Sequence, residues 1–504
     1  MDSSVIRRRV IGVVLSVSAA VVCAEGATRI LDGYQLWSIR LRRVRHAQPA
    51  EAPDRQYQSS IPLASGVSPS WYEQDPPPIA RIPLTPAVAA RQSAYQGNPY
   101  NAFMIWNSVY VRQRLCGSAD NGVGAFGELR DFLLFDPPDQ QPYPTYRHMP
   151  GVSPTGWFVI NSFGWRGPDL AAARSRDVIR IAFVGASTTV DPYYTPFSHI
   201  ELVGHWLNEW ASVRGLPYRF EVVNAARSGI DSSSIREVVR QEVLSVDPDL
   251  IVYYEGANDF APGKALRLPE SLPSAPTATF RARGAAENYS ALAGRMFDAV
   301  LKFTGRGGFE PSKPRYPFKW IDGVAEGAPD ISQPKLPMDQ QVLVSNLEAI
   351  RTAAAHNGTE LALASFVWMV YPGMRLDLDR HLTLFRYLNE TYFPATYAHM
   401  RRMADFQNRV FQAFARAHSV TYLPMAEMYP QNPDLFGDAI HMTERGLRLQ
   451  AWIYFQQLVP LIQSRIDAHQ WPKAPSATPV PAAWRTQPPR EMSRASIMAA
   501  CPVH

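Results

Sequence analysis

A serine, a histidine and an aspartate in this sequence have the residue types of an acyl-transfer site. Ser187 follows the glycine of a GAS triplet, where the hydrophobic run VIRIAFV ends. A serine hydroxyl becomes an effective nucleophile when a general base takes its proton, and His441 is the candidate base because imidazole titrates near neutral pH. Asp438 precedes this histidine by three residues, so its carboxylate can turn back onto the imidazole and fix the tautomer.

The elements around these residues predict an α/β fold. From about residue 177, short apolar runs alternate with amphipathic stretches. Strands that are apolar along their whole length are typical of a parallel sheet covered by helices on both faces. We therefore predict a three-layer, doubly wound domain with a five-stranded parallel sheet, similar to flavodoxin in architecture. The expected strands are 176–185, 218–226, 247–256, 360–370 and 420–425, and the expected helices are 197–214, 232–245, 338–358, 389–418 and 443–466.

Local patterns give more detailed expectations for two of these helices and for one turn. The first helix should bury one face, formed by Leu202, Trp206, Leu207 and Trp210. In the second helix, Ser234 and Glu237 have the spacing of a capping box. Arg166 lies between glycines in SFGWRGP, where we expect a structural arginine in a turn rather than a site residue.

Four short pieces fall in order after the predicted strands or in the loop before the last helix. They are GAS, the glycine of NAARSGIDSSS, GAND and DAIH. In this order and context the sequence resembles the SGNH (GDSL-like) hydrolase family over residues 157–467. The resemblance implies that Ser187 is the nucleophile, His441 the base and Asp438 the orienting acid.

The same resemblance implies an oxyanion hole. Its donors would be the backbone N–H groups of Ser187 and Gly229 and the side-chain amide of Asn258, and a side chain at Gly229 would obstruct the substrate. Ala186 departs from the family, which often has an aspartate between the glycine and the serine. Because that aspartate is usually not the acid of the triad, alanine leaves the mechanism intact and marks a divergent member.

Composition narrows the function classes. The 504 residues carry 50 basic and 45 acidic side chains, and this balance, together with the lack of a nucleic-acid-binding motif, argues against a nucleic-acid partner. The cysteines Cys23, Cys116 and Cys501 form no C-x-x-C pair, so we predict no metal site, and no cofactor is expected. A Cys116–Cys501 disulfide stays open for an oxidising compartment.

The N-terminus reads as a membrane signal. Three arginines at 7–9 precede the apolar run Val10–Ala24, which is shorter than the roughly 20 residues of a spanning helix. A cleaved signal peptide, an uncleaved signal anchor and a buried soluble helix are the alternatives. We favour the anchor, with the catalytic domain exported to the periplasm or the cell exterior, over secretion after cleavage. Residues 27–45 are expected to continue as an amphipathic helix whose arginines meet lipid headgroups or form a solvated face.

These patterns divide the chain into four parts. Residues 1–45 are the signal anchor and juxtamembrane helix, and 46–156 form an irregular, proline-rich extension. The hydrolase domain is 157–467, with an insertion or lid at 260–337. The Pro/Ala-rich tail 468–504 is expected to be disordered.

Three functions remain open from the sequence. The first is a serine esterase or deacylase that acts through an acyl-enzyme on Ser187, on an acyl ester of an envelope glycan or lipid. The second is an O-acyltransferase that uses the same residues to acylate a glycan hydroxyl. The third is a non-catalytic envelope binding or assembly protein that retains the fold. The sequence gives no oligomeric state.

Overall fold

The computed structural model describes most of the chain from residue 159 onward and parts of the chain before it. The described residues are 3–31, 34–39, 54–79, 131–134, 159–171, 173–192, 195–271, 289–304, 316–374, 376, 378–475 and 490–493. The Cys116–Cys501 pair, most of the 46–156 extension and most of the tail lie outside the described residues. The domain boundaries predicted above therefore stay predictions.

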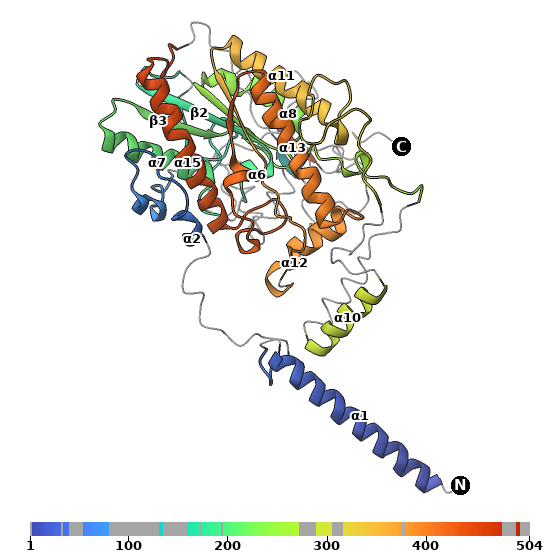
Figure 1. Cartoon of the computed structure of the whole chain (residues 1–504). Coiled ribbons are helices and arrows are strands. Elements are labelled where there is room, and N and C mark those ends of the chain that lie inside the picture. Colours follow the sequence, from blue (N-terminus) through green and yellow to red (C-terminus); the bar gives the residue numbers. More distant parts are fainter. Residues whose placement is uncertain are drawn as a thin grey trace.

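A five-stranded, all-parallel sheet organises the α/β domain (Figure 1). Its spatial order is β3-β2-β4-β5-β6, so the chain reverses its winding direction beside β2. This order confirms the predicted doubly wound fold, in which ligands bind at the carboxyl edge near the reversal point. The strands are β2 (Val178–Gly185), β3 (Arg219–Asn224), β4 (Leu250–Tyr254), β5 (Glu360–Ala364) and β6 (Thr421–Leu423).

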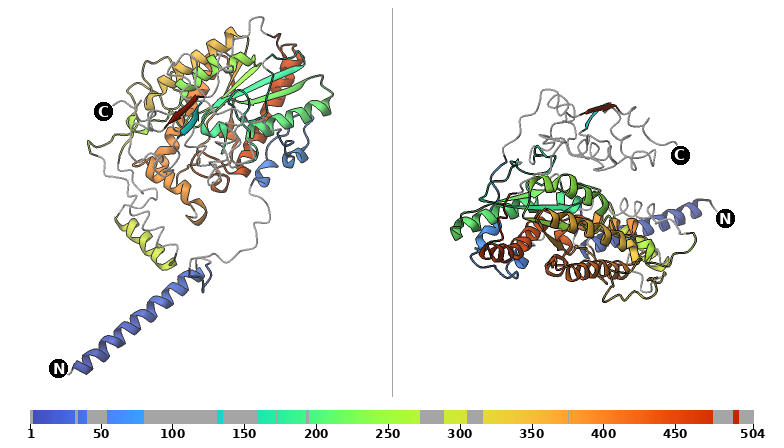
Figure 2. Two further views of the ribbon diagram at one scale, coloured as in Figure 1. Left: turned by 180° about the vertical axis from the view of Figure 1, so that it is seen from behind. Right: turned by 90° about the horizontal axis from the view of Figure 1, so that it is seen from above.

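Helices cover both faces of this sheet, as the apolar strands require. On one face α7 packs against α15, and on the other α11 packs against α8 and α13 (Figures 1 and 2). All residues of β2 and β4 are buried between these layers. The helices of the two layers are α7 (His199–Arg214), α8 (Ser232–Gln241), α11 (Gln340–His356), α13 (Tyr397–Ala417) and α15 (Glu444–Asp467).

Shorter elements complete the described structure. Near the N-terminus and the tail they are α1 (Ser3–Leu31), α2 (Arg55–Gln58), η1 (Pro69–Glu73) and the antiparallel pair β1 (Asp131–Leu134) and β7 (Arg490–Ser493). Between the sheet strands they are α6 (Ser187–Val190), η3 (Val243–Val246), η4 (Pro262–Lys264), α10 (Ala291–Thr304), η5 (Pro337–Asp339), α12 (Leu378–Arg386), the π-helix η6 (Tyr387–Thr391), α14 (Met425–Met428) and η7 (Pro433–Leu435).

The predicted buried face of α7 is confirmed. Its leucine and tryptophan side chains are all within 3% of full burial, and Trp206 meets Trp452 of α15 edge to face at 5.2 Å between ring centroids. Such aromatic pairs contribute beyond their buried area. This contact helps to hold α7 and α15 together as the helix layer on one face of the sheet.

Three local predictions were wrong. Asp231, not Ser234, caps α8: its carboxylate accepts from the Ser234 N–H at 2.9 Å, and the helix begins at Ser232. The helix predicted at 389–418 starts only at Tyr397, where Thr396 closes a capping box after the π-helical turn η6. The amphipathic helix predicted for 27–45 ends at Leu31.

One described helix is long and apolar enough to cross a membrane. It is the segment Val10–Leu31 of α1, 22 residues that are exposed from Val10 to Cys23 and that include the buried Thr28 and Arg29 in the last turns. A retained anchor and a signal sequence both have this feature. In Figure 1, α1 projects away from the sheet domain.

Candidate active site

Ser187 occupies a tight turn at the carboxyl end of β2. The strand ends at Gly185, and α6 begins at Ser187 itself. A Cβ at Gly185 would collide with the side chain of Thr189 and the carbonyl of Tyr254. Thr189 Oγ1 also donates to that carbonyl at 2.6 Å, so the turn is held against the neighbouring strand β4. The glycine is therefore required by close packing under the serine.

Asp438 and His441 are brought together by a small loop before α15. The Gly437 N–H donates to the His441 carbonyl at 2.8 Å, which closes the loop. Asp438 Oδ1 accepts from the N–H groups of Ile440 and His441, at 2.9 and 2.8 Å. The second oxygen, Oδ2, lies 2.7 Å from His441 Nδ1. The DAIH sequence thus folds its acid back onto its histidine, as the spacing predicted.

The three predicted side chains form one hydrogen-bonded chain. His441 Nε2 lies 2.8 Å from Ser187 Oγ, although the two residues are 254 positions apart. A carboxylate only accepts hydrogen bonds, so the contact with Asp438 places the imidazole proton on Nδ1 and leaves Nε2 as the acceptor for the serine hydroxyl. This is the arrangement that removal of the serine proton requires.

Asp438 stays ionised at neutral pH. Its burial acts to raise the pKa, but the hydrogen bonds from His441 and Ile440 outweigh burial and lower the pKa below its ordinary value. The side chains of His441 and Asp438 keep 29% and 17% of their exposure, and Ser187 is half-buried. The site is therefore open to solvent on one side.

The expected oxyanion donors lie in the loops on either side of Ser187. Gly229 follows β3 and Asn258 follows β4, and these strands flank β2 in the sheet. Gly229 has φ +77°, a left-handed conformation that favours glycine. Asn258 Nδ2 donates to the Ile230 carbonyl at 2.8 Å, which orients the amide beside the Gly229 loop. An amide nitrogen carries two hydrogens, so the second remains for an oxyanion.

A buried glutamate supports Asn258 and was missed from the sequence. Glu255 is 1% exposed, and its Oε1 accepts from the Asn258 N–H at 2.7 Å. Burial, with the nearby Asp259 carboxyl, raises the pKa of Glu255 to about 8. Burial likewise raises the pKa of Asp259 to about 6, although Ser232 donates to that carboxylate. The position of Glu255 directly after an apolar strand is the feature of the sequence that could have identified it as a buried acid near the site.

An aromatic cluster beside Asp438 was also missed. Trp368, which follows β5, contacts Phe260 at 4.6 Å and Tyr392 at 5.6 Å between ring centroids. Tyr387 lies 5.5 Å from Tyr392. Burial raises the pKa of Tyr387 to about 12, and the charge of Asp438 adds to this shift. Tyr392 lies in the stretch 389–418 that was predicted as regular helix, and Tyr387 precedes that stretch.

Two contacts brace the loop that carries the histidine. The Met369 N–H donates to the Ala439 carbonyl at 2.8 Å, which joins the loop to the segment after β5. His381 of α12 lies 2.8 Å from an oxygen of Asp434, just before the loop. The segment after β5 and helix α12 therefore both help to hold the loop that carries His441.

Arg166 supports the opposite side of the serine turn. The guanidinium is fully buried and donates to the carbonyls of Pro192 and Thr195, at 3.0 and 2.9 Å. Its Nε lies 3.3 Å from the buried Glu201 carboxylate. These contacts fix the chain between α6 and α7, which is the structural role expected from the sequence.

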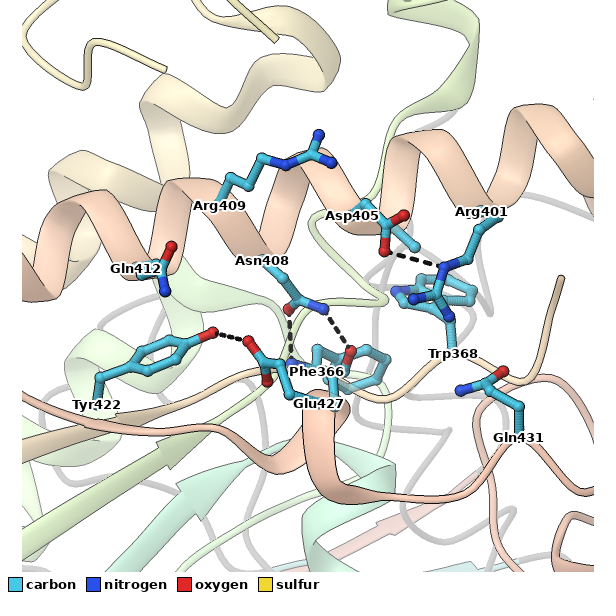
Figure 3. Close-up of a pocket in the computed structure, with 12 residues that line it drawn as sticks. Phe366, Trp368, Arg401, Asp405, Asn408, Arg409, Gln412, Tyr422, Glu427 and Gln431 are labelled. Atoms are coloured by element: carbon cyan, nitrogen blue, oxygen red, sulfur yellow. Dashed lines mark hydrogen bonds and ion pairs between the residues drawn. The ribbon is translucent and has the colours of Figure 1, made fainter. Parts of the chain in front are cut away.

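The pocket shown in Figure 3 is separate from this site. It has a volume of about 280 Å³, and none of the triad residues lines it. Asn408 of α13 spans its floor by bonding both the N–H and the carbonyl of Phe366, at 2.7 and 2.9 Å. At its edge Tyr422 donates to Glu427 at 2.6 Å. These four residues hydrogen-bond to one another in two pairs, so we interpret their contacts as structural.

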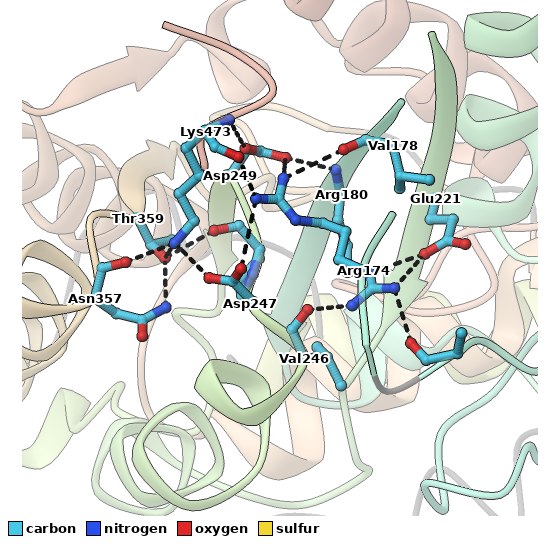
Figure 4. A network of polar contacts seen from close by, with 12 residues as sticks. Arg174, Val178, Arg180, Glu221, Val246, Asp247, Asp249, Asn357, Thr359 and Lys473 are labelled. Carbon is cyan, nitrogen blue, oxygen red and sulfur yellow. Dashed lines mark hydrogen bonds and ion pairs between the residues drawn. The ribbon is translucent and has the colours of Figure 1, made fainter. Parts of the chain in front are cut away.

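A polar network at the amino edge of the sheet is structural as well (Figure 4). Asp249 accepts from the N–H groups of Arg180 in β2 and Lys473 after α15, both at 2.8 Å. Lys473 Nζ donates in turn to the Asn357 carbonyl at 2.6 Å. The network joins the starts of the central strands to the end of the domain, on the edge opposite Ser187. Within the described ranges, no group of three or more His, Cys, Asp or Glu side chains is arranged to hold a metal ion.

Comparison with known proteins found no matching family model and no matching curated protein. Several solved structures are similar in fold. A GDSL-like lipase from Bacteroides thetaiotaomicron is 13% identical over 58% of this chain and 93% of its own, with a TM-score of 0.29. A lipase/acylhydrolase from Enterococcus faecalis is 15% identical over 56% and 96%, with a TM-score of 0.30. An acetylxylan esterase from Geobacillus stearothermophilus is 12% identical over 56% and 96%, with a TM-score of 0.31.

Proposed function

We propose that this chain is a divergent SGNH-type serine hydrolase that cleaves acyl esters. The observation that carries the proposal is the continuous hydrogen-bonded chain from Ser187 Oγ through His441 to Asp438. A non-catalytic protein that only retained the fold would have no need to keep all three groups aligned. The hydrogen-bond distances of 2.8 and 2.7 Å, and a His441 tautomer with its proton on Nδ1, favour catalysis over a purely structural role.

The first half-reaction forms an acyl-enzyme. His441 Nε2 takes the proton of Ser187 Oγ as that oxygen attacks the carbonyl carbon of the ester. The carbonyl oxygen gains the negative charge and is stabilised by the N–H groups of Ser187 and Gly229 and by the amide of Asn258. Loss of one such donor lowers the rate by about 10²–10³-fold. His441 then returns the proton to the leaving alkoxide, the carbon–oxygen bond breaks, and the alcohol departs.

The second half-reaction releases the acid. Water enters from the solvent-exposed side of His441, which removes a proton from it as the water oxygen attacks the acyl carbon. The bond to Ser187 Oγ breaks, and the serine regains its proton from the imidazole. The open side of the triad favours water over a sugar hydroxyl as the acceptor. O-acyl transfer is therefore retained only as an outcome of the experiment below.

For the substrate we propose an acylated glycan or lipid of the cell envelope. Tyr387, the half-buried ring of the aromatic cluster, has an amphipathic side chain that suits either a sugar or an acyl chain. Helix α1 supports an anchor that keeps the domain next to a membrane. We place the domain on the exported side because the arginines at 7–9 precede the apolar run. In this setting the reaction needs no diffusible cofactor.

The experiment compares the full chain in detergent with its Ser187→Ala variant on a short acyl ester. The Ser345→Ala variant is the matched control, because this exposed serine lies on α11, away from the site. Wild type and the control should hydrolyse the ester and react with a fluorophosphonate probe, and Ser187→Ala should do neither. Equal slow hydrolysis by wild type and Ser187→Ala would contradict the proposal. Acylated glycan, formed instead of free acid when a glycan is added, would identify the transferase.

A further inference from the structure

Helix α10, within the insertion at 260–337, is attached to α1 rather than to the sheet. Figures 1 and 2 show it beside the domain-proximal end of α1, apart from the helix layers. It leaves this end sideways and does not run back along α1. The two helices are in contact, although nearly 260 residues separate them in sequence. The end of the apolar helix therefore meets a second helix at one point.

The contact is a cap that one helix supplies to the other. Glu25 of α1 accepts from the N–H groups of Ala291 and Leu292 and from Ser290 Oγ, at 3.0, 2.9 and 2.8 Å. The first N–H groups of a helix lack partners within the helix, and a carboxylate there also meets the positive end of the helix dipole. Glu25 thus fixes the start of α10 to a defined turn of α1.

Arg29 extends this joint to the chain after α1. It pairs with Glu25 at 2.6 Å and donates to the Tyr289 carbonyl at 2.9 Å. It also donates to the carbonyls of Gln35, Leu36 and Ser38, at 3.1, 3.2 and 2.7 Å. One buried guanidinium therefore holds α1, the start of α10 and residues 34–39 together.

Apolar side chains around this joint are exposed. Trp37 and Ile39 are 95% and 86% exposed, and Met296 and Val300 on α10 are 61% and 56% exposed. Ile30 and Leu31 at the end of α1 are exposed as well. A large apolar patch of this kind marks an interaction surface, and exposed tryptophan next to an apolar helix is typical of the membrane–water interface.

We propose that α10 and residues 34–39 dock on the surface of the same lipid bilayer that α1 enters. The Glu25–Arg29 pair holds this docking element at the level where α1 leaves the lipid. The uninterrupted apolar part, Val10–Ala24, would span only about 22 Å at 1.5 Å per residue, less than the roughly 30 Å of a bilayer core. The remaining turns carry two charges, which are neutralised by each other and by α10.

Lipid fits this surface better than a protein partner. The exposed apolar residues belong to segments that contact the end of α1, whose own apolar side chains are exposed, so one bilayer can cover both. The sequence after Ile39 reads RLRRVR, which complements anionic headgroups. An amphipathic helix in the plane of the interface, next to a spanning helix, orients the attached domain toward the membrane.

The test uses the full chain in vesicles of phosphatidylethanolamine and phosphatidylglycerol, with the native cysteines replaced by alanine. A single cysteine at Met296 or Val300 carries an environment-sensitive fluorophore, and lipids with a nitroxide near the headgroup act as quenchers. The matched control is a cysteine at Val213, which is 64% exposed on α7. Quenching at 296 and 300 should be several-fold stronger than at 213. Equal quenching at all three positions would overturn the docking surface.

A second arm tests the joint. In the Met296→Cys background, Glu25→Gln should lower the quenching several-fold while α1 stays resistant to carbonate extraction. Glu348→Gln, which removes an exposed ion pair on α11, should leave the quenching unchanged. Unchanged quenching in Glu25→Gln would overturn the role of the pair. Since fluorescence does not depend on ester hydrolysis, Ser187→Ala should behave as wild type, and failure of the proposed function would not affect this result.

Discussion

Replacing Asp438 by asparagine should invert the tautomer of His441. In the wild type, one Asp438 oxygen accepts two backbone N–H groups and the other faces His441 Nδ1. In Asp438→Asn the backbone N–H groups still need an acceptor, so the amide oxygen keeps the first position and the NH₂ group takes the second. The imidazole must then accept at Nδ1 and carry its proton on Nε2. A protonated Nε2 cannot remove the proton of Ser187.

The expected loss is about 10⁴-fold in kcat, as for the corresponding change in other serine triads. At 1.36 kcal/mol for each factor of ten, this equals about 5 kcal/mol of transition-state stabilisation. The same hydrogen-bond positions remain filled, so thermal stability should change little. Steady-state hydrolysis of a short acyl ester by the full chain in detergent measures kcat, and circular dichroism measures unfolding.

The control is Asp467→Asn, at the far end of α15. Asp467 accepts an exposed hydrogen bond from Gln463 at 2.8 Å, so this variant should keep kcat within a few-fold of wild type. A value for Asp438→Asn above about one tenth of wild type would refute the tautomer argument, since removal of a transition-state interaction of this size cannot leave the rate nearly intact.

Three further variants test the supports of the site. Glu255→Gln should flatten the pH dependence of thermal stability. In the wild type the folded pKa of about 8 exceeds the ordinary 4.5, so between these pH values the native carboxyl holds a proton that the unfolded chain has lost. The wild-type free energy of unfolding should therefore fall as pH rises through this range, by up to about 5 kcal/mol. A wild type as stable at pH 9 as at pH 5 would contradict this. Arg166→Met should destabilise the fold by about 3–5 kcal/mol, because it leaves Glu201 buried without its cation, and adding Glu201→Gln should recover part of the loss in a melting experiment. Gly185→Ala should lower both the melting temperature and kcat, by about 1–3 kcal/mol in stability, because the new methyl group pushes against Thr189 under the nucleophile; an unchanged melting curve would argue against this packing.

The sheet and the triad were predictable because their signals are local. Each strand is a short apolar run, and each site residue follows a strand or precedes the last helix. The Asp438–His441 contact depends on a three-residue spacing, whereas the contact from His441 to Ser187 depends only on the strand order that brings both loops to one edge. Once the parallel fold was inferred, the long-range contact followed from it.

The wrong predictions arose where two local signals compete. Ser234 and Glu237 have capping-box spacing, but Asp231 lies one turn earlier and takes the Ser234 N–H first. Residues 389–391 begin the predicted helix, yet the chain forms the π-helical turn Tyr387–Thr391 there, and a regular helix starts only after the Thr396 cap. Tertiary packing decides where each of these helices begins, and the amino-acid pattern of one segment carries no information about that packing.

Glu25 shows most clearly how a distant contact changes the meaning of a residue. In the sequence it marks the end of an apolar run, where an unpaired acid would be costly within lipid. In the structure it is the cap of α10 and the partner of Arg29, within an α1 that is helical on both sides of Ala24. Cleavage after Ala24 would make Glu25 the chain terminus and place a new ammonium group beside Arg29 and the positive end of α10. On this electrostatic ground we propose that α1 is retained as an anchor.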